Sequence, residues 1–136
     1  MGAKAEDRYG ADADMMVEIL RGAIQRVGRG WKRGELAANR DGEPVSANSP
    51  SAVAWTAEGA IWASDFGTNP CSDVVRFVAT VLGLPGGTGN SHHDNPSWSI
   101  SEWNDALGRT RQDVLDGLGL ACALARCQAE VETARE

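Results

Sequence analysis

One stretch near the middle of the chain, residues 50–64, is apolar on nearly every side when it is drawn as a helix. Only Thr56 and Glu58 are distinctly polar in its middle. A helix that is apolar all round lies buried, because no side of it is suited to water. The preceding Ser49-Pro50 pair is typical of a helix start, with an N-cap serine and proline at the first helical position. We therefore expect a buried central helix over residues 50–64, with the rest of the chain packed around it.

Four further helices are predicted by apolar residues that recur at helical spacing, bounded by capping and stop signals. A capping box, in which the N-cap side chain and the residue three positions later bond each other's backbone N–H, marks the start at Ser99 with Glu102, and Thr110 with Asp113 caps the last helix. The four are a helix from an N-cap at Asp12 or Asp14 to a stop at Gly28 and Gly30, a helix after Asn69-Pro70 that ends at Gly83 and Pro85, a short helix Ile100–Leu107 behind Ser99 and Glu102, and a last helix from Thr110 and Asp113 to about Glu132.

The predicted fold class is all-α: a compact single-domain bundle of about five helices around the buried central helix. Asp41-Gly42 indicates a tight turn, which predicts either a minimal hairpin near residues 36–45 or an irregular loop. Residues 1–11 are expected to form a disordered N-terminal segment. Residues 12–136 then make one helical domain, in keeping with a length of 136 residues.

The charge of the chain is acidic overall but unevenly spread. It has 13 Lys+Arg against 19 Asp+Glu, a formal net charge of −6, which argues against nucleic-acid binding through overall charge. A basic segment within residues 20–45 is either a solvated face or a surface for an anion or a partner. Its six basic residues are Arg21, Arg26, Arg29, Lys32, Arg33 and Arg40.

Composition also bears on the compartment. No apolar run approaches the roughly 18 residues of a membrane helix, and the first residues are polar and acidic rather than signal-like. The three cysteines, Cys71, Cys122 and Cys127, contain no CxxC pair and are expected to be reduced and buried as small hydrophobic side chains. We therefore expect a cytoplasmic protein with no membrane partner.

Several short strings, among them Gly30-Trp31, Trp103-Asn104-Asp105 and Arg109-Thr110, together resemble an uncharacterised family of small proteins from phages, prophages and actinobacteria. The resemblance covers roughly residues 16–128, and its most specific part is the WND…RT…VL string. It implies a phage-related accessory role, in the host-cell cytoplasm, and it implies no particular reaction. Members of the family often carry cysteine after the tryptophan of the central helix, where this chain has Thr56, which argues against an essential thiol there. The strings are Gly30-Trp31 with Lys32-Arg33-Gly34, Ala38-Asn39-Arg40-Asp41-Gly42, Ser49-Pro50, Ala54-Trp55, Gly59-Ala60, Trp103-Asn104-Asp105, Arg109-Thr110 and Asp113-Val114-Leu115.

One cluster of metal-ligating residue types occurs, His92, His93 and Asp94, in the glycine-rich stretch 85–97. Zinc sites usually need three or four ligands, so a carboxylate or Cys71 would have to complete it. A solvated, mobile surface loop is the simpler interpretation, and we predict no metal and no cofactor. The chain contains no H-E-x-x-H, P-loop or G-x-S-x-G motif.

Two places carry residue types that suit recognition. At the predicted corner between the last two helices, Asp105 and Arg109 are four positions apart and able to pair, and Trp103 is expected to anchor the corner. With Asn104 they form either this architectural corner or a polar pocket. Trp31, next to two basic residues, is either a lid on the core or an exposed recognition residue, since tryptophan and arginine are enriched at binding hot spots.

The preferred hypothesis is a non-enzymatic protein-binding module, a phage-related accessory or anti-defence protein that occupies a host protein complex such as a CRISPR-type nuclease. One alternative is nucleic-acid binding through the basic segment 21–40, and another is a metal-dependent enzyme centred on residues 92–94. The chain is expected to be a monomer or a homodimer. The candidate partner-binding residues are Arg26, Arg29, Trp31, Lys32, Arg33, Arg40, Asn104, Asp105 and Arg109.

Overall fold

The computed structural model describes residues 13–64, 71–84 and 96–135, which form five helices and three short strands. The expectations for residues 1–11 and for nearly all of the 85–97 stretch lie outside these ranges. In chain order the elements are α2 (Ala13–Arg29), β1 (Ala37–Ala38), β2 (Pro44–Val45), β3 (Ala54–Trp55), α3 (Ala57–Ala63), α4 (Cys71–Val81), α5 (Pro96–Asp105) and α6 (Arg111–Arg135).

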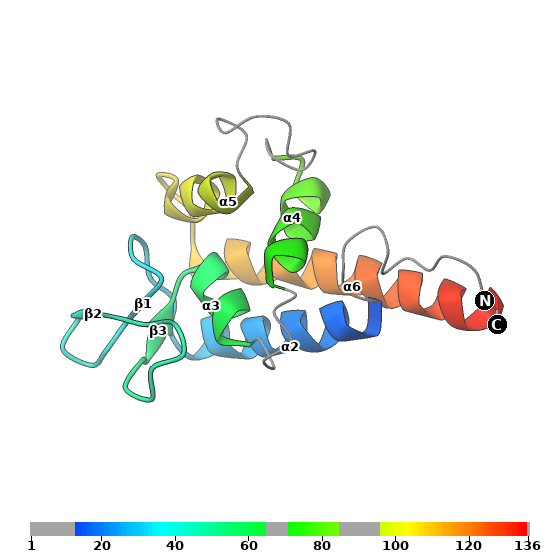
Figure 1. The fold of residues 1–136 in the computed structure, drawn as a ribbon. Coiled ribbons are helices and arrows are strands. Elements are labelled where there is room, and N and C mark those ends of the chain that lie inside the picture. Colours follow the sequence, from blue (N-terminus) through cyan, green and yellow to red (C-terminus); the bar gives the residue numbers. More distant parts are fainter. Residues whose placement is uncertain (1–12, 65–70, 85–95, 136) are drawn as a thin grey trace.

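Helices α2 and α6 run antiparallel and side by side along one edge of the molecule (Figure 1). The apolar stripe of α2 explains this, because it places one continuous buried side against α6. Helices α4 and α5 lie on the opposite side, and α3 lies between α2 and α5. The small sheet lies at the end of the molecule where α2 stops and α6 begins (Figure 1).

The sheet has the strand order β2-β1-β3, with both pairs antiparallel. Strands β1 and β2 form a hairpin near residues 36–45, so of the two alternatives left open by the sequence the structure has the hairpin and not the irregular loop. Gly42 has φ of +83°, a conformation that glycine adopts without strain, and the Asn39 carboxamide accepts hydrogen bonds from the backbone N–H groups of Asp41 and Glu43. The turn is thus specified by its own residues.

The all-α prediction is wrong, since the chain combines helices with this three-stranded sheet and is mixed α/β. The error comes from residues 50–56, which do not continue the central helix. The backbone N–H groups of Val53 and Trp55 bond to the carbonyls of Ala38 and Gly30, at 2.9 Å each. In a helix these N–H groups would bond within the segment, so the distant partners decide in favour of a strand.

The central helix instead begins behind Thr56, whose hydroxyl accepts a hydrogen bond from the Gly59 N–H at 3.0 Å. Gly59 is required by a close approach: an added Cβ would lie 1.9 Å from the carbonyl oxygen of Leu36. Residues 57–61 are all buried. The prediction of a buried central helix is therefore confirmed for α3, and its apolar extension towards residue 50 is a separate strand and loop.

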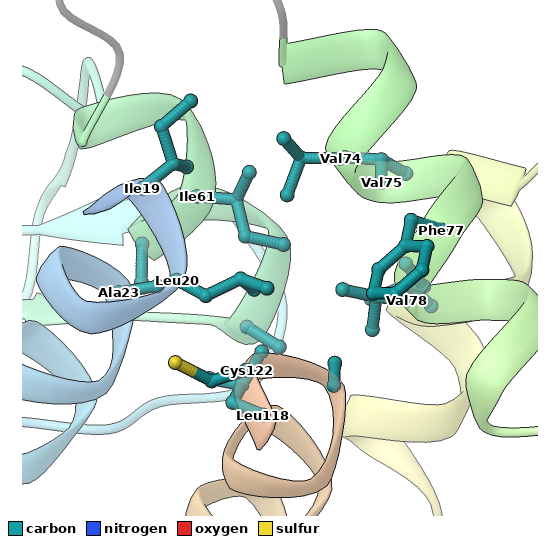
Figure 2. Packing of buried hydrophobic residues seen from close by; sticks show 14 of the residues in the cluster. Ile19, Leu20, Ala23, Ile61, Val74, Val75, Phe77, Val78, Leu118 and Cys122 are labelled. Carbon is teal, nitrogen blue, oxygen red and sulfur yellow. The ribbon is translucent and has the colours of Figure 1, made fainter. Parts of the chain in front are cut away.

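Side chains from four helices meet in one core (Figure 2). Ile61 of α3 points towards Leu20 of α2 and Val74 of α4, and Leu118 of α6 lies below them; all four are fully buried. Each such side chain contributes about 1.5–3 kcal/mol through its removal from water. The core therefore ties α3 to three other helices at once.

The remaining helix boundaries follow the capping signals only in part. Helix α4 stops before Gly83, as predicted. Helix α5 begins at Pro96, so Ser99 and Glu102 lie inside the helix and the prediction of a capping box at its start is wrong. The helix ends at Asp105, two residues before the predicted end. The predicted cap of the last helix by Thr110 and Asp113 is confirmed, and it forms a capping box: Asp113 accepts from the Thr110 N–H at 3.0 Å, and the Thr110 hydroxyl accepts from the Asp113 N–H at 3.1 Å.

Candidate functional site

The turn after α2 and the turn after α5, which lie more than seventy residues apart in the sequence, meet in the structure. The indole N–H of Trp31 donates to Asn104 Oδ1 at 2.8 Å, and the backbone N–H of Gly34 donates to Asp105 Oδ1 at 3.0 Å. Arg33 Nη2 donates to the carbonyl oxygen of Arg109 at 2.7 Å. The structure thus brings together six of the nine candidate partner-binding residues, namely Trp31, Lys32, Arg33, Asn104, Asp105 and Arg109.

Asn104 is fully buried and holds this junction together. Its Oδ1 also accepts the backbone N–H of Ala57 at 3.0 Å, and its Nδ2 donates to the Lys32 carbonyl and to Asp105 Oδ1, both at 3.0 Å. These contacts use both donors and both acceptor positions of the carboxamide. Asn104 therefore positions the surrounding residues and has no polar atom left for a partner.

Two arginines at the junction are held with their charges unpaired. The Arg33 guanidinium lies over the Trp31 ring, 5.0 Å from its centroid, and the Arg109 guanidinium lies over the Trp103 ring at 4.5 Å. Arg109 Nε also donates to the Trp103 carbonyl at 2.8 Å, so Arg109 caps the C-terminal end of α5, whereas Arg33 bonds the turn that follows this helix. Within the described ranges neither guanidinium has a carboxylate within 4 Å. The expected Asp105–Arg109 pair does not form.

Between these arginines the chain turns from α5 into α6 and exposes a leucine. Leu107 has a relative exposure of 103%, the highest among the exposed large apolar side chains of the described residues. Gly108, which follows it, has φ of +82° and so reverses the chain without strain. Arg33 holds this turn in place, because its guanidinium donates a hydrogen bond to the carbonyl oxygen of Arg109 at the far end of the turn. We call the four residues Trp31, Arg33, Leu107 and Arg109 the Arg33–Arg109 corner.

Lys32 has a different role from its neighbour. Its Nζ donates to the carbonyls of Arg33 and Glu35 and forms an ion pair with the Glu35 carboxylate at 3.1 Å. The backbone N–H of Glu35 and the Lys32 ammonium hold the pKa of the Glu35 carboxyl below its ordinary value. Lys32 thus closes the 32–35 loop on itself and contributes little free charge to the corner.

The other three candidate residues lie elsewhere. Arg26 Nη1 donates to Ser64 Oγ at 3.1 Å, and burial, followed by the nearby Arg29, lowers the pKa of the Arg26 guanidinium. Arg29 is exposed at the last position of α2, and Arg40 is exposed in the hairpin turn. The basic segment of the sequence is therefore divided among separate places on the surface.

The cysteines and the predicted metal-ligating cluster complete the set of candidate residues. Cys122 is buried as expected, whereas Cys127 is exposed, and the Cys71 side chain lies outside the described set. His92, His93 and Asp94 also lie outside it. The residues that the structure describes contain no cluster of three metal-ligating side chains. No helix among them is long and apolar enough to cross a membrane.

The sequence reasoning missed Leu107, because it placed this residue at the end of a helix that in fact stops at Asp105. A signal was present: Asn104 and Asp105 both have weak helix propensity, and Gly108 follows within three residues. Together they indicate an earlier helix end, which leaves Leu107 in the turn.

Comparison with known proteins shows the family of the chain. No curated protein and no solved structure matches the chain. A family model, described as a family of unknown function (DUF6197), matches residues 12–124. The match runs from the start of α2 into the second half of α6, so it includes both turns that form the corner. The chain belongs to the DUF6197 family, whose function is unknown.

Proposed function

We propose that this chain is a non-catalytic protein-binding module that docks onto a partner protein through the Arg33–Arg109 corner. The observation that carries the proposal is Leu107, which is fully exposed on a turn braced by two arginines. A single exposed leucine is common on protein surfaces and would carry no argument alone. Here it lies beside two oriented arginines and a tryptophan, which are residue types enriched at binding hot spots.

The chemistry of the corner also defines the partner surface. Leu107 fits a shallow apolar pocket, and the free N–H groups of Arg33 and Arg109 suit carboxylates at the rim of that pocket. Both guanidiniums are already oriented by the tryptophan rings and by backbone carbonyls. Little side-chain entropy is therefore lost when the partner binds. The partner is an acidic protein surface with an apolar centre.

A cellular role follows from the same proposal. The module is phage- or prophage-borne and acts in the cytoplasm of the host cell, where it occupies a defence complex such as a CRISPR-type nuclease. The small size of the chain and the resemblance of its strings to phage and prophage proteins support this role. Occupying a complex requires only a preformed surface of the kind found at the corner.

The nucleic-acid alternative has less support from the geometry. The basic residues of segment 21–40 point to separate places, and Arg33 covers one side of the Trp31 ring on which a base would stack. The Trp31 indole N–H is also already bonded, to Asn104. A duplex or single strand would need a continuous basic path, since phosphate contacts supply most of the affinity.

The test is capture from nuclease-treated host lysate with three versions of the chain: wild type, Leu107→Asp and Val53→Asp. Val53 is the matched control, because it is also an exposed apolar residue, at 45%, in the loop before β3. Replacing fully exposed Leu107 should change the free energy of unfolding by no more than about 0.5 kcal/mol. Affinity for the partner should fall at least about 30-fold, as for a hot-spot residue.

We expect wild type and Val53→Asp to retain the same stoichiometric protein and Leu107→Asp to lose it. Equal retention by all three versions would exclude the corner as the docking surface. Capture of nucleic acid instead of protein, in untreated lysate and with a steep loss on added salt, would favour the alternative.

A further inference from the structure

Helix α6 has a second apolar stripe that faces solvent, apart from its buried side. Leu120, Leu124 and Val131 are exposed to 50%, 46% and 50%, and Cys127 between them is also exposed. Their spacing of four, three and four residues places them on one side of the helix, in the pattern by which two helices pack along a seam. The buried side of α6 is formed by other residues, Val114, Leu118, Ala121, Cys122 and Ala125.

A groove of about 490 Å³ lies beside this stripe, between α2 and α6. Arg21 of α2 and Arg126 of α6 provide its two positive charges. Arg21 forms one ion pair, with Glu18 at 3.6 Å. Both side chains are exposed, so this ion pair contributes little to stability. Arg126 has no carboxylate within 4 Å among the residues described. The rest of the lining is Ile24, Gln25, Gly119, Cys122 and Ala123.

The second half of α6 also continues beyond α2. The Cys122 thiol contacts the Val17 carbonyl at 4.0 Å, so in this antiparallel pair the first residue of α2, Ala13, is level with about residue 126 of α6. Helix α6 continues to Arg135, and Figure 1 shows its red end extending past the start of α2. No described segment covers the stripe there.

We propose that the stripe pairs with the stripe of a second copy of this chain, so that two α6 helices run antiparallel about a two-fold axis. One register buries all four stripe residues of both copies. It places Leu120 against Val131 of the second copy and Leu124 against Cys127 of the second copy. The contact is isologous, because each copy uses the same surface.

Charge complementarity favours a second copy of this chain as the partner of the stripe. In this register Glu130 is level with residue 121 of the second copy, between the Gly119 and Ala123 that line the groove. At about 1.5 Å per residue, Arg126 of the second copy is about 7.5 Å away along the axis and Arg21 about 4.5 Å away on the other side, within the reach of their side chains. Glu130 is exposed and has no ion pair within the described ranges. The two-fold axis repeats the contact, so each copy supplies one acid and accepts one.

The experiment is a charge exchange between copies, followed by sedimentation equilibrium on the full chain over about 1–100 µM, the range of a modest interface. One variant is Glu130→Arg, which places a cation opposite the groove. The other is the double variant Arg21→Glu with Arg126→Glu, which makes the groove acidic. Glu102→Arg, an exposed position on α5, carries the same change of charge as the first variant and serves as its control.

Wild type and Glu102→Arg should sediment at twice the 14.4 kDa chain mass at the upper concentrations. The dimer of Glu130→Arg alone and that of the Arg21→Glu, Arg126→Glu double variant alone should each dissociate at least about tenfold more readily, because each change opposes like charges in both halves of the interface. An equimolar mixture of the two should form the dimer again, which no contact within one chain can explain. Circular dichroism would verify that the variants keep their helices.

A wild-type chain that stays at 14.4 kDa throughout would overturn the proposal. It would also be overturned if both variants remain dimeric alone, since the dimer would then use another surface, or if the mixture of folded variants stays monomeric. The stripe runs from Leu120 towards the C-terminal end of α6, whereas the Arg33–Arg109 corner lies before the first residue of this helix, so Leu107→Asp should leave this equilibrium unchanged. Failure of the dimer and failure of the proposed docking surface are thus distinguishable.

Discussion

Replacing Asn104 with alanine tests how the corner is built. The change removes four hydrogen bonds, of which the one from the Ala57 N–H is buried. A buried donor left without an acceptor costs about 1–3 kcal/mol, and each of the other three bonds contributes about 1 kcal/mol. We therefore expect Asn104→Ala to lower the free energy of unfolding by about 4–6 kcal/mol, a large part of the 5–15 kcal/mol typical of a domain.

Two further variants extend this prediction. For each, the free energy of unfolding is measured by urea unfolding followed by circular dichroism. Trp31→Phe removes only one of the four bonds and should cost about 1 kcal/mol from that bond. Asn104→Asp keeps the acceptor but places an oxygen opposite the Lys32 carbonyl and the Asp105 carboxylate. Burial and the neighbouring Asp105 should raise the pKa of the new carboxyl.

The sign of the pH dependence follows from that raised pKa. Below the ordinary pKa of aspartate the carboxyl is protonated in both the folded and the unfolded chain, so Asn104→Asp has its smallest effect there. The destabilisation grows as the pH rises above that value and is complete above the raised pKa of the folded state. A loss of less than about 1 kcal/mol for Asn104→Ala would refute the view that this carboxamide holds the junction together.

Three other outcomes follow from the packing and charges. Gly59→Ala should destabilise the chain by at least about 3 kcal/mol, because its Cβ would lie 1.9 Å from the Leu36 carbonyl oxygen. In Gly28→Ala, near the end of α2, the added Cβ has no atom within 4 Å, and the variant should be more stable by about 0.5 kcal/mol. Relative to wild type, the urea midpoint should fall for Gly59→Ala and rise for Gly28→Ala. Lys32→Met should raise the pKa of Glu35 towards its ordinary value in an NMR titration, and an unchanged pKa would contradict the ion pair.

Local signals in the sequence were sufficient for much of the fold. The stripe of α2, the stop of α4 before Gly83, the hairpin turn at Asp41-Gly42 and the Thr110–Asp113 capping box each depend on residues a few positions apart. Side-chain spacing and turn chemistry determine such features. They could therefore be predicted from one sequence.

The start of the central helix depends on distant partners and could not be found in this way. The hydrogen bonds of residues 53–55 go to Gly30 and Ala38, and the close approach at Gly59 involves Leu36. Within residues 50–64 the residue type of Thr56, which suits an N-cap, is the local sign of a later helix start. Ser49-Pro50 offered a competing signal.

The candidate site, too, could be predicted only in part from the sequence. The sequence identified the residue types at both turns, yet only the fold brings Trp31 and Arg33 next to Asn104 and Arg109. It could not show that Asn104 is buried, because that depends on contacts from three separate segments.

Photocrosslinking inside host cells tests the central claim most directly. The photoreactive residue p-benzoyl-phenylalanine would be placed at Leu107, and in a separate chain at Val53 as the control, both of which are exposed. If the Arg33–Arg109 corner is a docking surface, irradiation should give one defined protein adduct at position 107 and none at position 53. No adduct at position 107, or the same adducts at both positions, would contradict the account.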